Sequence, residues 1–277
     1  MRRKLALLVV LVACRPTVKD GPSPASTKTP DAALTDAGSP IASAVGDAAP
    51  PAPTERAIGP YEMPFAGARN VYYVVPKSTK KPQRLIANLH GVCNPPGYAC
   101  GYWVEAASSV GFLVCPEGNA KCGNNPKGVP TWSQPLPKFD DDLEKAIAAV
   151  DTKYPGEIAR DDAILTGFSL GAWAAYHIAK AHPGRWKYLI LTEADVPLDA
   201  AQLRAADVRA VAMLAGEIGT QIAGQKRTIE RLKKAGYPAR FWVMKGAGHH
   251  YSADIDTLMA EAMEFVLSAS TMTDAGR

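Results

Sequence analysis

From Ile58 onward, the sequence alternates short apolar runs with helical patterns, and this alternation constrains the fold more than any other feature. The apolar runs read VYYVV, RLIANLH, GFLVC, AILTGF, KYLILT, RAVAMLA and ARFWVMK. The helical patterns read DDDLEKAIAAVDTKY, SLGAWAAYHIAKAH and QIAGQKRTIERLKKAG, and a last one runs from about Ala253 to Ser268. Strands that alternate with helices pair in parallel through crossovers, and runs that are apolar throughout are typical of a sheet covered on both faces. We therefore predict an α/β domain over residues 58–277, with a doubly wound, mostly parallel sheet and helices on both faces.

Residues 1–14 have the layout of a secretory signal peptide. MRRK is a basic n-region, and LALLVVLVA is an apolar run too short to span a bilayer as a helix of the mature protein. The run ends in LVAC, which resembles the lipobox of bacterial lipoproteins, a family in which the cysteine thiol receives a diacylglyceryl group. This resemblance implies lipidation of Cys14 and attachment to a membrane through acyl chains. The alternatives are an ordinary signal peptide and a cysteine placed there by chance.

Residues 15–57 are rich in Pro, Ala, Ser, Thr and Asp and contain almost no large apolar side chains. Such a segment cannot offset the entropy that ordering would remove, so we expect a disordered tether. Following a lipidated cysteine, this tether predicts an exported protein held at the cell envelope. Arg15 stands where a retained lipoprotein would have an aspartate, and resemblance to lipoprotein sorting rules therefore favours the outer membrane over the inner one.

The charge of the chain does not indicate a nucleic-acid partner. Its 31 Lys and Arg against 27 Asp and Glu give a net charge of +4. Arg2, Arg3 and Lys4 contribute three of these charges, so removal of the signal peptide leaves about +1. Nucleic-acid binding needs a basic surface that neutralises phosphates. We predict that nucleic acid is not a partner.

Apart from Cys14, the chain has four cysteines, an even number that indicates two disulfides in an exported protein. They are Cys93, Cys100, Cys115 and Cys122. Pairing neighbours in sequence would close two short loops, but four cysteines allow three connectivities and the spacing does not choose among them. Metal binding is the alternative, and it is disfavoured because the spacings are not those of a Cys-x-x-Cys site.

The stretch ILTGFSLG places Ser169 between two glycines, after an apolar strand and before a helix. This is the pattern of a nucleophile elbow, a sharp strand-to-helix turn that lifts a serine hydroxyl clear of the sheet. Glycines are needed there because the strand and helix backbones converge. The backbone N–H of Leu170 would then point towards an oxyanion at the start of the helix. The alternative is a serine that only caps the helix.

The portion from about Val71 to Leu267 resembles the α/β-hydrolases, of the secreted esterase and polyhydroxybutyrate-depolymerase-like kind. The motifs that carry the resemblance are LHGVC, FDDDLEKAIAAV, GFSLG and GAGHHYS. The resemblance implies that the loop after His90 supplies a second oxyanion donor near Val92. It also implies that His249, after the last strand, is the general base, with its neighbour His250 as the weaker candidate.

The acid partner of the histidine is where this sequence departs from the family. In the family the acid commonly follows the seventh strand, in a Gly-x-x-Asp pattern, but here Gly216 is followed three residues later by Gly219. Two replacements are available: Asp195 at the end of the sixth strand, an acid position in some lipases of this fold, and Glu217 on the expected loop. We favour Asp195 and keep Glu217 as the alternative. Glu193 lies two residues before Asp195, and the third possibility is that no functional acid exists.

These patterns predict a lipid-anchored serine esterase that acts outside the cytoplasm through an acyl-enzyme on Ser169. Its substrate would be a small or polymeric carboxylic ester, and we expect neither a metal nor an organic cofactor. A peptidase or acyltransferase could use the same residues. A lipoprotein that uses a hydrolase scaffold without catalysis is the alternative from a different class, and the missing Gly-x-x-Asp is its main support.

Overall fold

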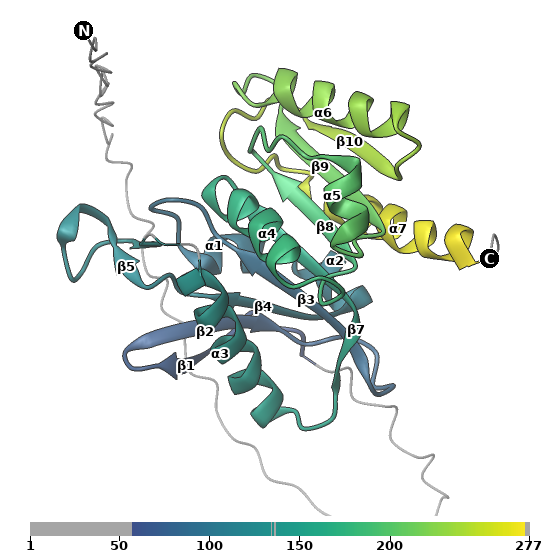
Figure 1. Ribbon diagram of the computed structural model, residues 1–277. Coiled ribbons are helices and arrows are strands. Elements are labelled where there is room, and N and C mark those ends of the chain that lie inside the picture. Colours follow the sequence, from purple (N-terminus) through teal and green to yellow (C-terminus); the bar gives the residue numbers. More distant parts are fainter. Residues whose placement is uncertain (1–56, 134, 136, 275–277) are drawn as a thin grey trace, which may run out of the picture. The chain divides into compact units, whose positions relative to one another are not determined.

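The structure, a computed structural model, describes residues 57–274 apart from Gln134 and Leu136. Its main feature is an eight-stranded sheet with the order β1-β2-β4-β3-β7-β8-β9-β10 (Figure 1). β1 and β2 form an antiparallel edge, β2 pairs antiparallel with β4, and the remaining neighbours pair in parallel. The strands are β1 Tyr61–Ala66, β2 Arg69–Val74, β3 Gln83–Leu89, β4 Gly111–Pro116, β7 Ile158–Phe168, β8 Tyr188–Thr192, β9 Ala210–Gly216 and β10 Ala239–Met244.

Helices cover both faces of this sheet, as the alternation of strands and helices predicts. On one face lie α3 Pro137–Lys153, α4 Leu170–Ala181, α5 Ala200–Ala205 and α6 Ile222–Lys234. On the other face lie α1 Pro96–Tyr102, α2 Val104–Val110 and α7 Ile255–Asp274 (Figure 1). The arrangement is the α/β-hydrolase fold, so the predicted fold class is confirmed.

The two cores follow from the alternation of side chains along each strand. On β3, Leu85 and Leu89 pack with the α3 and α4 side, whereas Ile86 packs with the α2 and α7 side. Because successive strand residues point to opposite faces, a strand covered on both sides must be apolar at every position. That requirement explains why the central strands read as continuous apolar runs.

Several short elements lack a clear sequence signal. They are the edge strand β1, the seven-residue helices α1 and α2, the short helix α5, and a small antiparallel ladder between β5 Ala120–Lys121 and β6 Pro130–Thr131. β1 contains Pro64, which cannot donate to a ladder and is tolerated because β1 is an edge strand. Segments this short are stabilised by tertiary contacts rather than by their own periodicity.

The four cysteines form the disulfides Cys93–Cys122 and Cys100–Cys115, with Cα–Cα distances of 5.6 and 6.2 Å. Of the three connectivities that the sequence left open, the pairing of sequence neighbours is therefore not the one formed. α1 carries Cys100 onto the buried Cys115 of β4, whereas Cys93 stays on the loop that leaves β3. Pairing depends on which Cα atoms come within about 7 Å of each other in space, and here they come from segments 15 and 29 residues apart.

The predicted signal peptide, the lipidation site Cys14 and the tether up to residue 56 lie outside the described residues. Within residues 57–274, no helix combines the length and the hydropathy needed to cross a bilayer.

Candidate active site

Ser169 lies between the end of β7 and the start of α4, with φ 54° and ψ −117°. A positive φ is unfavourable for a residue with a side chain and costs about 1–3 kcal/mol, so the surrounding structure must hold it. The flanking glycines leave no room for a Cβ: one on Gly167 would lie 2.3 Å from the Gly171 oxygen, and one on Gly171 would lie 1.9 Å from the Leu89 oxygen. The strand-to-helix elbow that the sequence predicts is therefore present.

His249 reaches Ser169 from the loop that follows β10. Its Nε2 atom lies 3.0 Å from the Ser169 Oγ atom, and its side chain is 52% exposed. The loop approaches closely because β9 ends in glycine: a Cβ on Gly216 would lie 2.1 Å from the Gly248 oxygen. His250 points elsewhere, since its Nδ1 lies 2.9 Å from the Tyr251 oxygen and its Nε2 accepts a hydrogen bond from the Gly248 N–H.

Glu193 is the acid that faces His249. Its Oε2 atom lies 3.1 Å from the His249 Nδ1 atom, its side chain is fully buried, and its Oε1 atom accepts a hydrogen bond from the Gly216 N–H. A carboxylate accepts hydrogen bonds, so the proton of a neutral His249 belongs on Nδ1 and the Nε2 lone pair faces the Ser169 hydroxyl. The three side chains thus form one hydrogen-bonded series in the tautomer that a general base needs.

The two acids favoured from the sequence lie elsewhere. Asp195 is 46% exposed and pairs at 4.0 Å with Arg227 of α6. Glu217 accepts a hydrogen bond from the Gly246 N–H at 3.0 Å, and that bond, together with Lys245, lowers the pKa of its carboxyl group. Neither Asp195 nor Glu217 is therefore the acid partner of His249, and the prediction is corrected to Glu193.

The correction has a physical reason in the direction of the chain after β8. Glu193 is the first residue after that strand, at the carboxyl edge of the sheet, and its backbone N–H is held by the Leu214 oxygen of β9. Two residues later the chain has turned towards α6, and the Asp195 N–H donates to Gln221. The signal that could have identified Glu193 is its place immediately after the run KYLILT, because ligand and catalytic groups of open α/β sheets gather at strand carboxyl ends.

Gly219, which replaces the aspartate expected from the family, lies beside the acid that is present. A Cβ on Gly219 would stand 3.4 Å from the Glu193 Oε2 atom. The loop after β9 and the loop after β8 therefore converge on the same side of His249. A carboxylate can be supplied from either loop, and this chain supplies it from the loop after β8.

The two N–H groups expected from the sequence as oxyanion donors, those of Leu170 and Val92, belong to backbone segments that adjoin the elbow. Leu170 begins the 12-residue helix α4, where free N–H groups and the helix dipole favour an anion. The loop with Val92 packs on the elbow, because a Cβ on Gly91 would lie only 3.1 Å from the Ser169 Cβ. Among the described residues, neither N–H has a hydrogen-bond acceptor, so both are free to bind a ligand oxygen.

His90 organises this loop from the buried side. Its Nε2 accepts a hydrogen bond from the Gly118 N–H at 2.9 Å, so the neutral ring carries its proton on Nδ1, which donates to the Gly91 oxygen at 2.8 Å. Burial lowers the pKa of His90 to about 4. The imidazole is therefore a neutral structural group and is not within the series formed by Ser169, His249 and Glu193.

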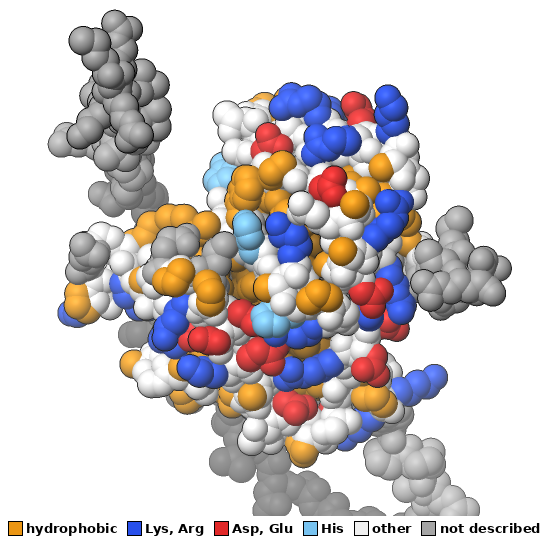
Figure 2. Space-filling view, viewed as in Figure 1, with side chains coloured by type: hydrophobic (Ala, Val, Ile, Leu, Met, Phe, Trp, Pro, Cys, Tyr) orange, Lys and Arg blue, Asp and Glu red, His pale blue; other side chains and the backbone are white. Residues whose placement is uncertain are grey.

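The surroundings of the site are apolar and partly open. Val92 is 56% exposed, and Ile218, on the loop after β9, is 74% exposed close to Gly248. Phe168 packs against both His249 and Tyr251, with ring centroids 5.1 Å apart in each case. In the view of Figure 2, histidine side chains lie on the visible face with hydrophobic side chains near some of them. An apolar surrounding of this kind suits a substrate with little charge near its reacting carbonyl.

Comparison with solved structures places the chain among α/β-hydrolase folds. It is similar to an S-formylglutathione hydrolase from Agrobacterium tumefaciens, with 15% identity, a TM-score of 0.54, and coverage of 76% of this chain and 94% of that one. A ferulic acid esterase from Anaeromyces mucronatus, solved with ferulic acid, matches with 15% identity and a TM-score of 0.54 over 79% and 94%. An S-formylglutathione hydrolase from Staphylococcus aureus matches with 15% identity and a TM-score of 0.52 over 74% and 96%. No family model matches the sequence, and no curated protein matches it.

The chain thus has the α/β-hydrolase fold and carries a serine, a histidine and a glutamate in hydrogen-bonding order. In chain order the series runs Ser169, Glu193, His249, which is the order nucleophile, acid, histidine of this fold.

Proposed function

We propose that this protein is a serine hydrolase that cleaves carboxylic esters through an acyl-enzyme on Ser169. The observation that carries the proposal is the continuous series of contacts from Ser169 Oγ to His249 Nε2 at 3.0 Å and from His249 Nδ1 to Glu193 Oε2 at 3.1 Å. A serine hydroxyl is a weak nucleophile on its own, and an adjacent base held by an acid is the arrangement that activates it.

The first half-reaction forms the acyl-enzyme. Ser169 Oγ attacks the ester carbonyl carbon while its proton passes to His249 Nε2, and the Glu193 carboxylate stabilises the resulting imidazolium. The carbonyl oxygen becomes an oxyanion that accepts hydrogen bonds from the N–H groups of Leu170 and Val92. Collapse of the tetrahedral intermediate breaks the carbon–oxygen bond of the ester, and the alcohol leaves with the proton from Nε2.

The second half-reaction restores the enzyme. His249 takes a proton from water, the resulting hydroxide attacks the acyl carbon, and the acid product leaves as Ser169 regains its proton. Every step uses groups of this chain and water alone. Similarity to proteins described as ferulic acid esterase and S-formylglutathione hydrolase, which act on an ester and a thioester, supports this reaction class.

The non-catalytic alternative loses its main support. It rested on the absence of an aspartate after Gly216, and Glu193 occupies the corresponding place beside His249. A peptidase or acyltransferase would use the same three side chains, so substrate preference must be measured. We favour an ester because the exposed apolar side chains of Val92 and Ile218 suit an uncharged substrate.

The decisive experiment is labelling of the full chain with a fluorophosphonate probe, followed by peptide mapping. We expect labelling at Ser169, loss of labelling in Ser169→Ala and His249→Ala, and hydrolysis of short-chain aryl esters by the wild type only. A panel of esters, amides and acyl acceptors separates esterase from peptidase and acyltransferase. Absence of labelling in folded, oxidised protein would overturn the proposal.

We also propose that the enzyme acts at the cell envelope, anchored through Cys14. The support is the sequence of residues 1–14 and the Pro- and Ala-rich segment that follows. Cys14→Ala should move the protein from the membrane fraction to the soluble fraction or leave its signal peptide uncleaved, as mass spectrometry of the N-terminus would show. Lipid anchoring would be contradicted if Cys14 of the wild type were unmodified and the Cys14→Ala variant stayed in the membrane fraction to the same extent.

A further inference from the structure

The loop that carries the Val92 N–H is not part of the sheet, so other contacts must fix its position. β3 ends at Leu89, α1 begins at Pro96, and Val92 lies between the two with an exposed side chain. An oxyanion donor works only when it is already in place before the reaction, because its value lies in needing no reorganisation. The contacts that hold this loop therefore bear on the rate of the reaction.

The peptide between Gly91 and Val92, which carries the Val92 N–H, is fixed by His90. The Gly91 oxygen accepts a hydrogen bond from His90 Nδ1–H at 2.8 Å, and the Nε2 of the same ring accepts one from the Gly118 N–H at 2.9 Å. A planar trans peptide directs its C=O and its N–H to opposite sides. Holding the Gly91 carbonyl on the His90 side therefore directs the Val92 N–H away from it.

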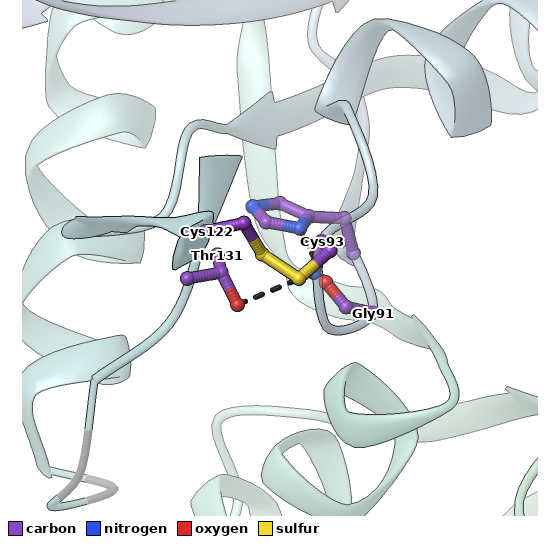
Figure 3. Close-up of a disulfide and its surroundings, with 5 residues drawn as sticks. Gly91, Cys93, Cys122 and Thr131 are labelled. Atoms are coloured by element: carbon purple, nitrogen blue, oxygen red, sulfur yellow. Dashed lines mark hydrogen bonds between the residues drawn. A yellow bond between two sulfur atoms is a disulfide. The ribbon is translucent and has the colours of Figure 1, made fainter. Parts of the chain in front are cut away.

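The next peptide, between Val92 and Cys93, is fixed through Cys93. Its N–H donates a hydrogen bond to the Thr131 hydroxyl at 3.3 Å, and its sulfur forms the disulfide with Cys122 (Figure 3). Cys93 also has φ 49°, a left-handed conformation that a cysteine does not adopt unless it is held there. The disulfide and the hydroxyl together maintain this conformation directly after the donor.

The partners that fix His90 and Cys93 belong to one segment, residues 118–132, which we call the clamp hairpin. They are Gly118, Cys122 and Thr131. It contains the ladder of β5 and β6, closed by the hydrogen bond from the Cys122 N–H to the Val129 oxygen. Its last residue, Trp132, follows β6. The Trp132 Nε1–H donates to the His90 oxygen at 2.9 Å, and the indole stacks on the His90 imidazole with ring centroids 4.8 Å apart. The clamp hairpin thus contacts the donor loop at His90 and at Cys93, on both sides of Val92.

We propose that Thr131 and the Cys93–Cys122 disulfide are positioning residues of the oxyanion site, and that the clamp hairpin holds the Val92 N–H in its reactive orientation. This inference rests on the proposed ester hydrolysis. The second disulfide offers a contrast, because Cys100–Cys115 is buried and joins α1 to β4. Cys93, in comparison, is exposed and next to the donor.

The test compares two double variants of the full chain, Cys93→Ser/Cys122→Ser and the control Cys100→Ser/Cys115→Ser. For the first we expect kcat to fall by about 10- to 100-fold with KM changed by less than about 3-fold, because an oxyanion donor acts mainly in the transition state. Affinity for a trifluoromethyl ketone, which forms an oxyanion on Ser169, should fall by the same factor as kcat/KM. For the control we expect a lower melting temperature and a kcat close to the wild type at a temperature where it is folded.

A milder pair of variants decides the matter if the double variant does not fold. Thr131→Val should lower kcat several-fold and weaken the ketone, and Thr131→Ser, which keeps the hydroxyl, should restore both. Wild-type kcat in folded Cys93→Ser/Cys122→Ser, or in Thr131→Val where the double variant does not fold, would overturn the inference. A wild-type protein that neither hydrolyses esters nor labels at Ser169 would instead overturn the proposed function, so the two failures are distinguishable.

Discussion

The buried carboxylate of Glu193 lies 3.1 Å from Nδ1 of His249, although the two are 56 positions apart in the sequence. β8 lies next to β7 in the sheet, so the residue that follows β8 emerges beside the serine that follows β7. The carboxylate has one oxygen on the imidazole and the other on the Gly216 N–H. It is therefore held in place by the backbone as well as by its partner.

Replacement of Glu193 should affect the chemical step. Glu193→Gln removes the charge that stabilises the imidazolium and disturbs the tautomer, and we expect kcat to fall by about 10²- to 10⁴-fold with a small change in KM. The matched controls Asp195→Asn and Glu217→Gln should stay within a few-fold of the wild type. Steady-state kinetics on an aryl ester measures all three. A larger loss in Asp195→Asn than in Glu193→Gln would contradict the assignment.

Acid should destabilise the fold through His90. Burial lowers its pKa from 6.5 to about 4, so between these values the unfolded chain binds a proton that the folded protein excludes. This group has no effect on stability above pH 6.5, and it lowers the free energy of unfolding by up to about 3 kcal/mol as the pH falls from 6.5 to 4. Urea unfolding at pH 7.5 and pH 5 measures the loss.

The matched variant for that measurement is His90→Gln. A glutamine can still accept from Gly118 and donate to Gly91 but does not titrate, so its stability should depend less on pH over the same range. An equal pH dependence in both proteins would show that other groups are responsible.

The elbow should not tolerate a side chain at Gly171. A Cβ there would lie 1.9 Å from the Leu89 oxygen, a backbone atom that cannot move independently of β3. We expect Gly171→Ala to lower the free energy of unfolding by about 3 kcal/mol or more, or to prevent folding. Gly101→Ala is the control, because its added Cβ meets no atom within 4 Å apart from its chain neighbours and the backbone of its own helix, and it should change stability by no more than about 1 kcal/mol. Chemical denaturation compares the two.

Asp142 forms an ion pair that should matter for stability and not for catalysis. Its fully buried carboxylate accepts two hydrogen bonds from Arg69, at 2.6 and 2.8 Å, and so links α3 to β2. Asp142→Asn leaves a partly buried guanidinium without its countercharge, and we expect a loss of about 3 kcal/mol. The kcat of the folded variant should equal that of the wild type. A change in stability below about 0.5 kcal/mol would show that water replaces the carboxylate without penalty.

Much of the fold and part of the site could be predicted from the sequence because their signals are local. The apolar run before Ser169, the two glycines and the helical pattern after it lie within a few residues of each other, and backbone crowding makes the glycines necessary. His249 follows the last apolar run, so its place after β10 is also a local feature. Chain order then favours this histidine as the partner of the serine.

Features that depend on distant segments could be decided only by the tertiary structure. Asp195 and Glu193 differ by two positions, and only the turn of the chain after β8 determines that Glu193 faces His249 while Asp195 faces Arg227. The disulfide pairing likewise depends on where α1 carries Cys100. The sequence by itself therefore determined the elbow and the longer strands and helices in their order along the chain, since steric limits and side-chain periodicity act between neighbours along the chain. The acid, the disulfides and the clamp hairpin were decided by the packing of the sheet, which brings strand ends together whatever their separation in sequence.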